Sequence, residues 1–172
     1  MKTFKRTLVI LLIVLILIQF VRPARNISAS QSPADTSTIY PVSANVGFVL
    51  KKACYDCHSN NTGYPWYANV QPVVWWLDDH IKEGKRGLNF SEFASYRIGR
   101  QYRKLEEVID EVKKGDMPLQ SYTIVHTDAR LTREEQVMLT SWADAIRDTI
   151  RAKYPVDSLI RKKQTYSMSG SF

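Results

Sequence analysis

The stretch Cys54-Tyr55-Asp56-Cys57-His58 decides both the chemistry and the architecture that this sequence predicts. It holds the only two cysteines of the 172-residue chain, and a histidine follows the second one directly. Two thiols at this spacing can add across the two vinyl groups on one edge of a porphyrin. The next residue then lies under the ring, where an imidazole can bind iron. The stretch therefore predicts one covalently attached haem c, with Cys54 and Cys57 as attachment points and His58 as proximal ligand.

Three other chemistries can use the same residues. A redox-active dithiol needs a lowered thiol pKa, which a helix N-terminus usually supplies. The apolar spacing over residues 46–54 instead predicts a helix that ends at the cysteines, where the helix dipole disfavours a thiolate. A zinc site needs four ligands, and only His80 and His126 remain to complete one. A structural disulfide between Cys54 and Cys57 is a third alternative in an oxidising compartment, but it leaves His58 without a role.

The N-terminal segment predicts export. Three basic residues precede an apolar run from Leu8 to Ile18, which is the pattern of a signal peptide and falls short of the roughly 20 residues that span a bilayer comfortably. Arg22 and Arg25 follow this run, and no clean Ala-x-Ala cleavage site is present. We expect an exported, periplasmic protein in which segment 1–22 is a signal peptide or an anchor that holds it at the inner membrane.

The charge distribution argues against a nucleic-acid partner. The formal net charge is +7, but five of the 24 Lys and Arg residues and none of the 17 Asp and Glu residues lie in residues 1–30. The remainder therefore carries a net charge of only about +2, without a basic stripe that could follow a phosphate backbone.

Composition divides the chain further. Residues 23–40 are rich in Ser, Ala, Thr, Asn and Pro and read as a flexible linker. The patterned sequence over 41–155 has the size of one small domain, which we expect to bind the haem. Residues 156–172 are expected to form a C-terminal tail.

Apolar periodicity predicts an all-α domain, and we expect this domain to wrap around the haem. The expected helices cover 43–54, 72–83, Asn89 or Ser91 to 114, and a last segment that ends before Pro155. Gly84 and Gly87 are expected to bracket the end of the second helix. The last helix begins with a capping box, Thr132 with Glu135 three residues on. The loops 59–71 and 115–131 are long, and a haem would fill the space between them.

Aromatic residues concentrate near the attachment site. They are Tyr55, Tyr64, Trp66, Tyr67, Trp75 and Trp76. We expect this group as a whole to wall the haem, although an ordinary aromatic core explains any single member equally well.

Four residues are candidates for the iron ligand opposite His58. Met117 lies before a proline at the start of an irregular loop, which could drape over the far side of the ring. His80 lies on the apolar face of the second helix, where a histidine is usually a core residue. His126 lies in a loop, and Met138 already fits the core pattern of its helix. We expect Met117 to be the distal ligand.

Five short stretches support this assignment in combination. They are Cys54-Tyr55-Asp56-Cys57-His58-Ser59-Asn60-Asn61, Tyr64-Pro65-Trp66-Tyr67, Gln71-Pro72-Val73 with Trp75-Trp76, Leu88-Asn89-Phe90-Ser91, and Asp116-Met117-Pro118. Together they resemble the small haem-binding domain family of exported bacterial mono-haem c-type cytochromes, over roughly residues 43–150. The resemblance implies a cytochrome c-like helical fold, in which Cys54 and Cys57 hold the haem, His58 is proximal and Met117 is distal. The family is named for its cofactor, so the resemblance leaves the partner open.

Two functions follow from the two possible states of the distal side. Iron bound by both His58 and Met117 has no open position and can only cycle between ferric and ferrous. We therefore expect a one-electron carrier, not an enzyme, that exchanges electrons with redox partner proteins in the periplasm or at the outer side of the inner membrane. The alternative is a peroxidase-like haem enzyme or a gas sensor with an open distal site, for which His80 or His126 would supply the acid and base.

Overall fold

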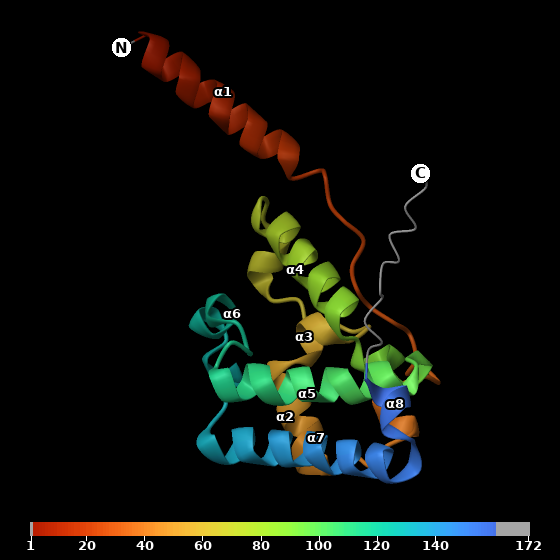
Figure 1. Ribbon diagram of the computed structural model, residues 1–172. Coiled ribbons are helices and arrows are strands. Elements are labelled where there is room, and N and C mark those ends of the chain that lie inside the picture. The colour runs from red at the N-terminus through yellow and green to blue at the C-terminus, as the bar shows by residue number, and fades with distance from the viewer. Residues whose placement is uncertain (1, 161–172) are drawn as a thin grey trace, which may run out of the picture.

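The computed structural model describes residues 2–160, and every regular element in that part of the chain is helical (Figure 1). The α-helices are α1 (Lys2–Ile18), α2 (Ala44–Ala53), α3 (Tyr55–His58), α4 (Val73–Gly87), α5 (Ile98–Lys114), α6 (Gln120–Val125), α7 (Arg133–Lys153) and α8 (Val156–Leu159). Short 3-10 helices are η1 (Thr36–Thr38), η2 (Trp66–Asn69), η3 (Phe90–Ser95) and η4 (Thr127–Ala129). The all-α prediction is confirmed. Most of the predicted tail, residues 161–172, lies outside the described residues.

The main core forms where α2, α5 and α7 meet. Helices α5 and α7 run side by side, and α2 packs against α7 (Figure 1). The long helices bury residues spaced by three, four or seven positions, such as Leu105, Ile109 and Val112 of α5. This spacing gives each helix one apolar stripe, and each such side chain stabilises the fold by about 1.5–3 kcal/mol when fully buried. The core therefore forms a platform under the segment that carries the two cysteines.

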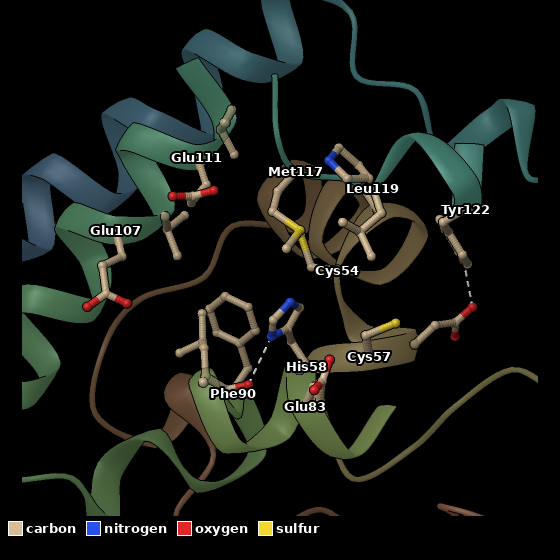
Figure 2. A pocket seen from close by; sticks show the side chains of 18 of the residues that line it. Cys54, Cys57, His58, Glu83, Phe90, Glu107, Glu111, Met117, Leu119 and Tyr122 are labelled. Carbon is tan, nitrogen blue, oxygen red and sulfur yellow. Dashed lines mark hydrogen bonds between the residues drawn. The ribbon is translucent and has the colours of Figure 1, made fainter. Parts of the chain in front are cut away.

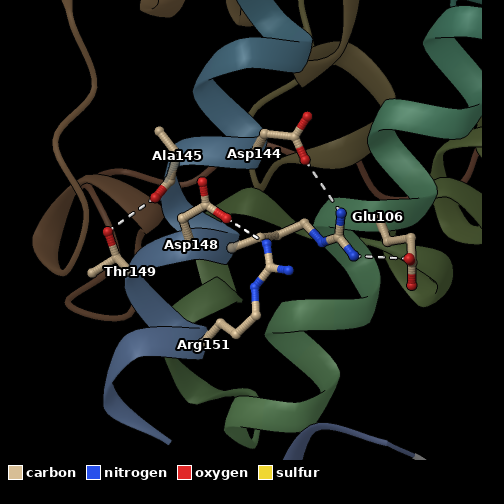
Figure 3. Close-up of polar contacts among 7 residues, drawn as sticks. Glu106, Asp144, Ala145, Asp148, Thr149 and Arg151 are labelled. Atoms are coloured by element: carbon tan, nitrogen blue, oxygen red, sulfur yellow. Dashed lines mark hydrogen bonds and ion pairs between the residues drawn. The ribbon is translucent and has the colours of Figure 1, made fainter. Parts of the chain in front are cut away.

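A largely buried arginine, Arg147, connects α5 to α7. The Arg147 guanidinium donates to Glu106 of α5 at 2.8 Å and to Asp144 of its own helix at 3.2 Å (Figure 3). It also lies 4.5 Å from the centre of the Tyr102 ring, and its side chain is only 14% exposed. Since both charged partners and the ring hold one rigid guanidinium, this joint fixes how the two helices align.

The start of α7 also holds the end of α2. The predicted capping box is confirmed, because the Thr132 hydroxyl accepts from the Glu135 N–H while the Glu135 carboxylate accepts from the Thr132 N–H. The same carboxylate pairs with Lys52 at 2.7 Å, and this pair is largely shielded from solvent. Lys52 lies two residues before Cys54, so α7 helps to place the cysteine segment.

Two predicted helices differ from the structure. Helix α4 does not end at 83 but continues through Gly84 to Gly87. The helix expected from Asn89 or Ser91 is divided into η3 and α5 by extended backbone at Tyr96 and Arg97. Phe90 and Phe93, three positions apart, are both fully buried, which favours the tighter 3-10 turn.

The chain before α2 contacts the domain at several points. The Asn26 side chain donates to the Ser59 carbonyl and to the Thr62 hydroxyl, both at 2.9 Å. The buried Thr36 hydroxyl donates to the Phe90 carbonyl at 2.9 Å. Helix α1 buries no residue and extends away from the remaining helices (Figure 1). Within residues 2–160, no helix combines the length and the apolar character that crossing a membrane requires.

Candidate functional site

A cavity of about 560 Å³ lies between α3, α4, α5 and the chain from Met117 to Tyr122 (Figure 2). This volume falls within the 300–1,000 Å³ that is usual for cofactor and ligand pockets. Both cysteines of the chain, His58 and Met117 line it, together with apolar side chains such as Leu88, Phe90 and Val112. Residues that the sequence analysis assigned to one site are thus brought to one cavity.

A short helical turn presents the three residues of the cysteine motif together. Cys54 is the residue between α2 and α3, and its N–H donates to the Leu50 carbonyl at 2.9 Å. Its own carbonyl accepts from the N–H groups of Cys57 and His58, at 3.2 and 2.9 Å. Residues three and four positions apart lie on the same face of such a turn, so all three side chains turn toward the cavity.

Both thiols are free, and neither is activated. Burial, and to a smaller extent the neighbouring Cys57, raise the pKa of Cys54 to about 12. Burial and the charge of Asp56 raise the pKa of Cys57 to about 11. A dithiol redox centre needs a lowered thiol pKa, so these surroundings argue against that chemistry.

His58 is held as a neutral imidazole with one nitrogen available. Its Nδ1–H donates to the carbonyl of Leu88 at 3.0 Å, which assigns the lone pair to Nε2. Burial lowers the pKa of His58, although the hydrogen bond to Leu88 opposes this shift. Metal-binding histidines usually have this arrangement, in which a carbonyl orients the ring and the other nitrogen binds the metal. Figure 2 shows the His58 ring directed into the cavity.

Gly84 explains why α4 can pass so close to this turn. A Cβ atom at Gly84 would lie 2.6 Å from the Cys57 carbonyl oxygen and 3.0 Å from the Cys57 Cβ. No side chain fits in that space, so the glycine serves close packing rather than the end of a helix. The approach also brings the residues after α4 near enough for the Leu88 carbonyl to reach His58.

The end of α5 directs Met117 to the cavity. Gly115 adopts a left-handed conformation with φ of 79°, which ends the helix. The N–H groups of Asp116 and Met117 both donate to the Glu111 carbonyl, at 3.0 and 3.2 Å. This tight turn reverses the chain and places Met117 on the cavity, where its side chain is directed toward the His58 ring (Figure 2).

The other three candidate ligands have different surroundings. His80 lines the cavity, and its Nδ1 is hydrogen-bonded to the Trp76 carbonyl at 2.8 Å. His126 is hydrogen-bonded through Nε2 to the Tyr67 hydroxyl and does not line the cavity. Met138 packs against the main core. His80 is therefore the one alternative that shares the cavity wall with Met117.

The expectation that the six aromatics near the motif wall the site is wrong. None of them lines the cavity, although all six lie in the described part of the chain. Trp66 is 79% exposed, and Trp75 and Trp76 are 39% and 48% exposed. The aromatic rings on the cavity wall are instead those of Phe90 and Tyr122. Both are more than 30 residues from Cys54 in the chain. Closeness to Cys54 in sequence therefore does not identify the aromatic residues of the cavity wall.

Tyr122 brings a further contact that the sequence analysis did not find. Its hydroxyl donates at 2.7 Å to the carboxylate of Asp56, which lies between the two cysteines (Figure 2). Burial, and then the hydrogen bond to Asp56, raise the pKa of Tyr122, so the phenol keeps its proton at neutral pH. No local pattern marks this pair, because 66 residues separate its members.

Comparison with known proteins identifies one relationship. The model of a family described as a haem-binding domain matches residues 13–145, which is more than half of the chain. No curated protein and no solved structure matches.

Proposed function

Because the chain belongs to the haem-binding domain family, we propose that it is a c-type cytochrome that carries one electron at a time. One observation carries the proposal. His58 and Met117 come from distant segments and line the same cavity, with the Met117 side chain directed toward the His58 ring in Figure 2, and Cys54 and Cys57 lie on that cavity as well. A carrier of this class requires two iron ligands and two attachment points, and these four residues would supply them.

The residues present fit a haem. The cavity has the volume of a cofactor pocket and walls that are largely apolar. It contains a neutral imidazole whose Nδ1–H is already engaged by the Leu88 carbonyl, so Nε2 is oriented for a metal. A thioether and two protonated thiols complete the set.

Each of these side chains has a definite role in the proposal. Cys54 and Cys57 would hold the haem covalently, each S–H adding across one vinyl group so that the sulfur bonds to one vinyl carbon and the hydrogen to the other. His58 would hold the iron through Nε2, and Met117 would hold it through its sulfur. When bound, the haem supplies an iron centre that gains and loses one electron. The apolar walls and the Gly84 contact limit water and movement around this centre.

Coordination by Met117 is what makes the protein a carrier in this proposal. A thioether sulfur raises the reduction potential, and a filled distal position leaves no place for a substrate. The carboxylates of Glu83, Glu107 and Glu111 also line the cavity, while Lys104 is paired with Glu107. Negative charge near the iron favours the ferric state, so these residues oppose the effect of Met117 on the potential.

A second candidate function has one observation in its favour. His80 lines the cavity, and its Nδ1 is engaged by Trp76. A histidine in that place could move a proton to or from a ligand on the distal side. A haem enzyme or gas sensor would then require that Met117 leaves the iron.

Location and partners complete the proposal. We place the protein outside the cytoplasm, because segment 1–22 has the pattern of a signal peptide or anchor and thioether attachment of haem follows export. Its partners are other redox proteins. With a net charge of about +2 outside residues 1–30, we expect weak electrostatic steering between them.

Redox titration of the purified holoprotein tests the proposal. Optical spectra collected across biological potentials should show one reversible transition with a one-electron slope. The rate of electron exchange with small charged mediators should depend only weakly on ionic strength. A protein that shows no reversible transition in this range is not an electron carrier.

A further inference from the structure

The segment that carries Met117 has few attachments to the rest of the domain. Helix α6, which begins three residues after Met117, buries only Thr123. Its Ile124 and Val125 side chains are 65% and 59% exposed, and its main packing partner is the adjacent turn η4. Apolar burial therefore contributes little to hold this segment over the cavity.

The hydrogen bond from Tyr122 to Asp56 is an attachment of a different kind. It joins α6 to the residue between the two cysteines, at 2.7 Å and with a carboxylate acceptor. The other Asp56 oxygen accepts from the Gly63 N–H at 2.8 Å, and the Asp56 carbonyl accepts from the Thr62 hydroxyl at 2.6 Å. Asp56 is thus held rigidly by the loop that follows the motif, and it is a fixed point for Tyr122.

The Tyr122 ring is held as well. It stacks on the His126 ring, with the ring centres 4.2 Å apart and the planes inclined by 14°. His126 is in turn hydrogen-bonded to the Tyr67 hydroxyl. The hydroxyl and the face of Tyr122 are therefore held by two separate parts of the chain, and the side chain lines the cavity between them.

We infer that Tyr122 and Asp56 form a clamp that keeps Met117 in place on the distal side of the cavity. Both are positioning residues, because they act on the iron through Met117. The inference rests on the proposed function, in which Met117 is a ligand. The clamp spans the site: Asp56 belongs to the segment that anchors the cofactor, and Tyr122 to the segment that supplies the distal ligand. It therefore couples the segment that would hold the cofactor to the segment that carries Met117.

The test compares two tyrosine variants of the holoprotein. Tyr122→Phe removes only the hydroxyl that donates to Asp56 and keeps the ring that stacks on His126. Tyr40→Phe is the matched control, since the Tyr40 hydroxyl donates to the Gln101 side chain, also at 2.7 Å, and Tyr40 packs against the main core away from the cavity. Carbon monoxide is mixed with each reduced protein, and the rate of binding is measured.

We expect Tyr122→Phe to bind carbon monoxide about tenfold faster or more, since a hydrogen bond to a charged group shifts a local equilibrium by this factor. Tyr40→Phe should bind as slowly as the wild type. Amide hydrogen exchange of residues 117–125 should accelerate in Tyr122→Phe alone. In a Met117→Ala background the Tyr122→Phe change should have no further effect on the rate, because the clamp acts only through Met117.

The outcomes separate this inference from the proposed function. If the wild type and Tyr122→Phe bind carbon monoxide equally slowly while Met117→Ala binds it rapidly, the clamp is wrong and the carrier stands. An equal acceleration in Tyr40→Phe, or an additive effect in the double variant, also overturns the clamp. If the wild type itself binds rapidly, Met117 is not a firm ligand, and both proposals fail together.

Discussion

The Nδ1 atom of His58 lies 3.0 Å from the carbonyl oxygen of Leu88, a residue 30 positions further along the chain. This contact joins α3 to the segment after α4, and it determines which nitrogen of the imidazole is free. Because a backbone carbonyl can only accept, Nδ1 carries the proton and Nε2 carries the lone pair. The close approach at Gly84 is what makes this contact possible.

Gly84→Ala should therefore damage the site. The added Cβ meets the Cys57 carbonyl at 2.6 Å, so α4 must move away from α3. We expect a loss of about 1–3 kcal/mol in the free energy of unfolding and a lower haem content. Chemical denaturation and the ratio of haem to protein measure both effects.

Gly87→Ala is the control for this change. Apart from the adjoining backbone, no protein atom lies within 4 Å of a Cβ built at Gly87, which is in the same helix and also lines the cavity. The comparison therefore uses only the free energy of unfolding. We expect no loss of stability there, and a gain of a few tenths of a kcal/mol from the reduced freedom of the unfolded chain. Equal damage at both positions would contradict the role given to Gly84.

Met117→Ala should open the distal side. Without the thioether, the reduction potential should fall on the order of 100 mV, a fraction of the ~0.8 V range that axial ligands span. Added imidazole should also bind to the ferric protein. Met138→Ala is the matched control, since Met138 packs against the main core. It should lower stability and leave the potential unchanged. If the reduction potential does not change in Met117→Ala, Met117 does not bind the iron.

Replacement of both cysteines should abolish covalent attachment. In the wild type, haem should stay with the chain on a denaturing gel, because two thioether bonds survive unfolding. In the Cys54→Ala, Cys57→Ala variant the chain should run without haem. Either single variant should retain one bond and part of the haem. Haem that leaves the denatured wild type would show that Cys54 and Cys57 do not bind it covalently.

The Lys52–Glu135 pair should make stability depend on pH. The hydrogen bond from Lys52 lowers the pKa of Glu135 in the folded protein below its usual value of 4.5. The pair therefore stabilises the fold fully above pH 4.5, and this contribution is lost as the pH falls through the lowered pKa. Glu135→Gln should cost about 1 kcal/mol at pH 7.

Unfolding curves of both proteins at several pH values measure this effect. The difference between wild type and Glu135→Gln should shrink steadily at pH values below 4.5. The exposed Asp157, changed to Asn, provides a comparison that should show little effect at any pH. A difference that stays constant down to pH 2 would mean that the ion pair contributes nothing.

Local patterns predicted the parts of the site that are local in the chain. Cys54, Cys57 and His58 lie within five residues, and the helix before them ends at the cysteines, as its apolar spacing predicts. The position of Met117 before a proline in an irregular loop predicts it as a candidate ligand, and Met117 lines the cavity. The capping box at Thr132 depends on two residues three positions apart, and it was also predicted correctly.

The parts that were missed depend on contacts between distant segments. A glycine near the end of an apolar pattern can either stop a helix or admit a neighbouring backbone, and only the packing against Cys57 distinguishes these for Gly84. The Leu88 carbonyl has no signature in the sequence, because every residue has a carbonyl. Tyr122 reaches Asp56 across 66 residues, so no pattern along the chain could select it.

The central claim is that His58 and Met117 both bind the iron, and one spectrum tests it most directly. The visible absorption of the reduced wild-type holoprotein is recorded before and after carbon monoxide is added. If both ligands are in place, the haem bands should keep their positions and intensities on mixing and change only slowly afterwards. If the bands shift as soon as the gas is mixed in, the distal position is open. Met117 would then lose its assigned role, and an enzyme or gas sensor would replace the carrier.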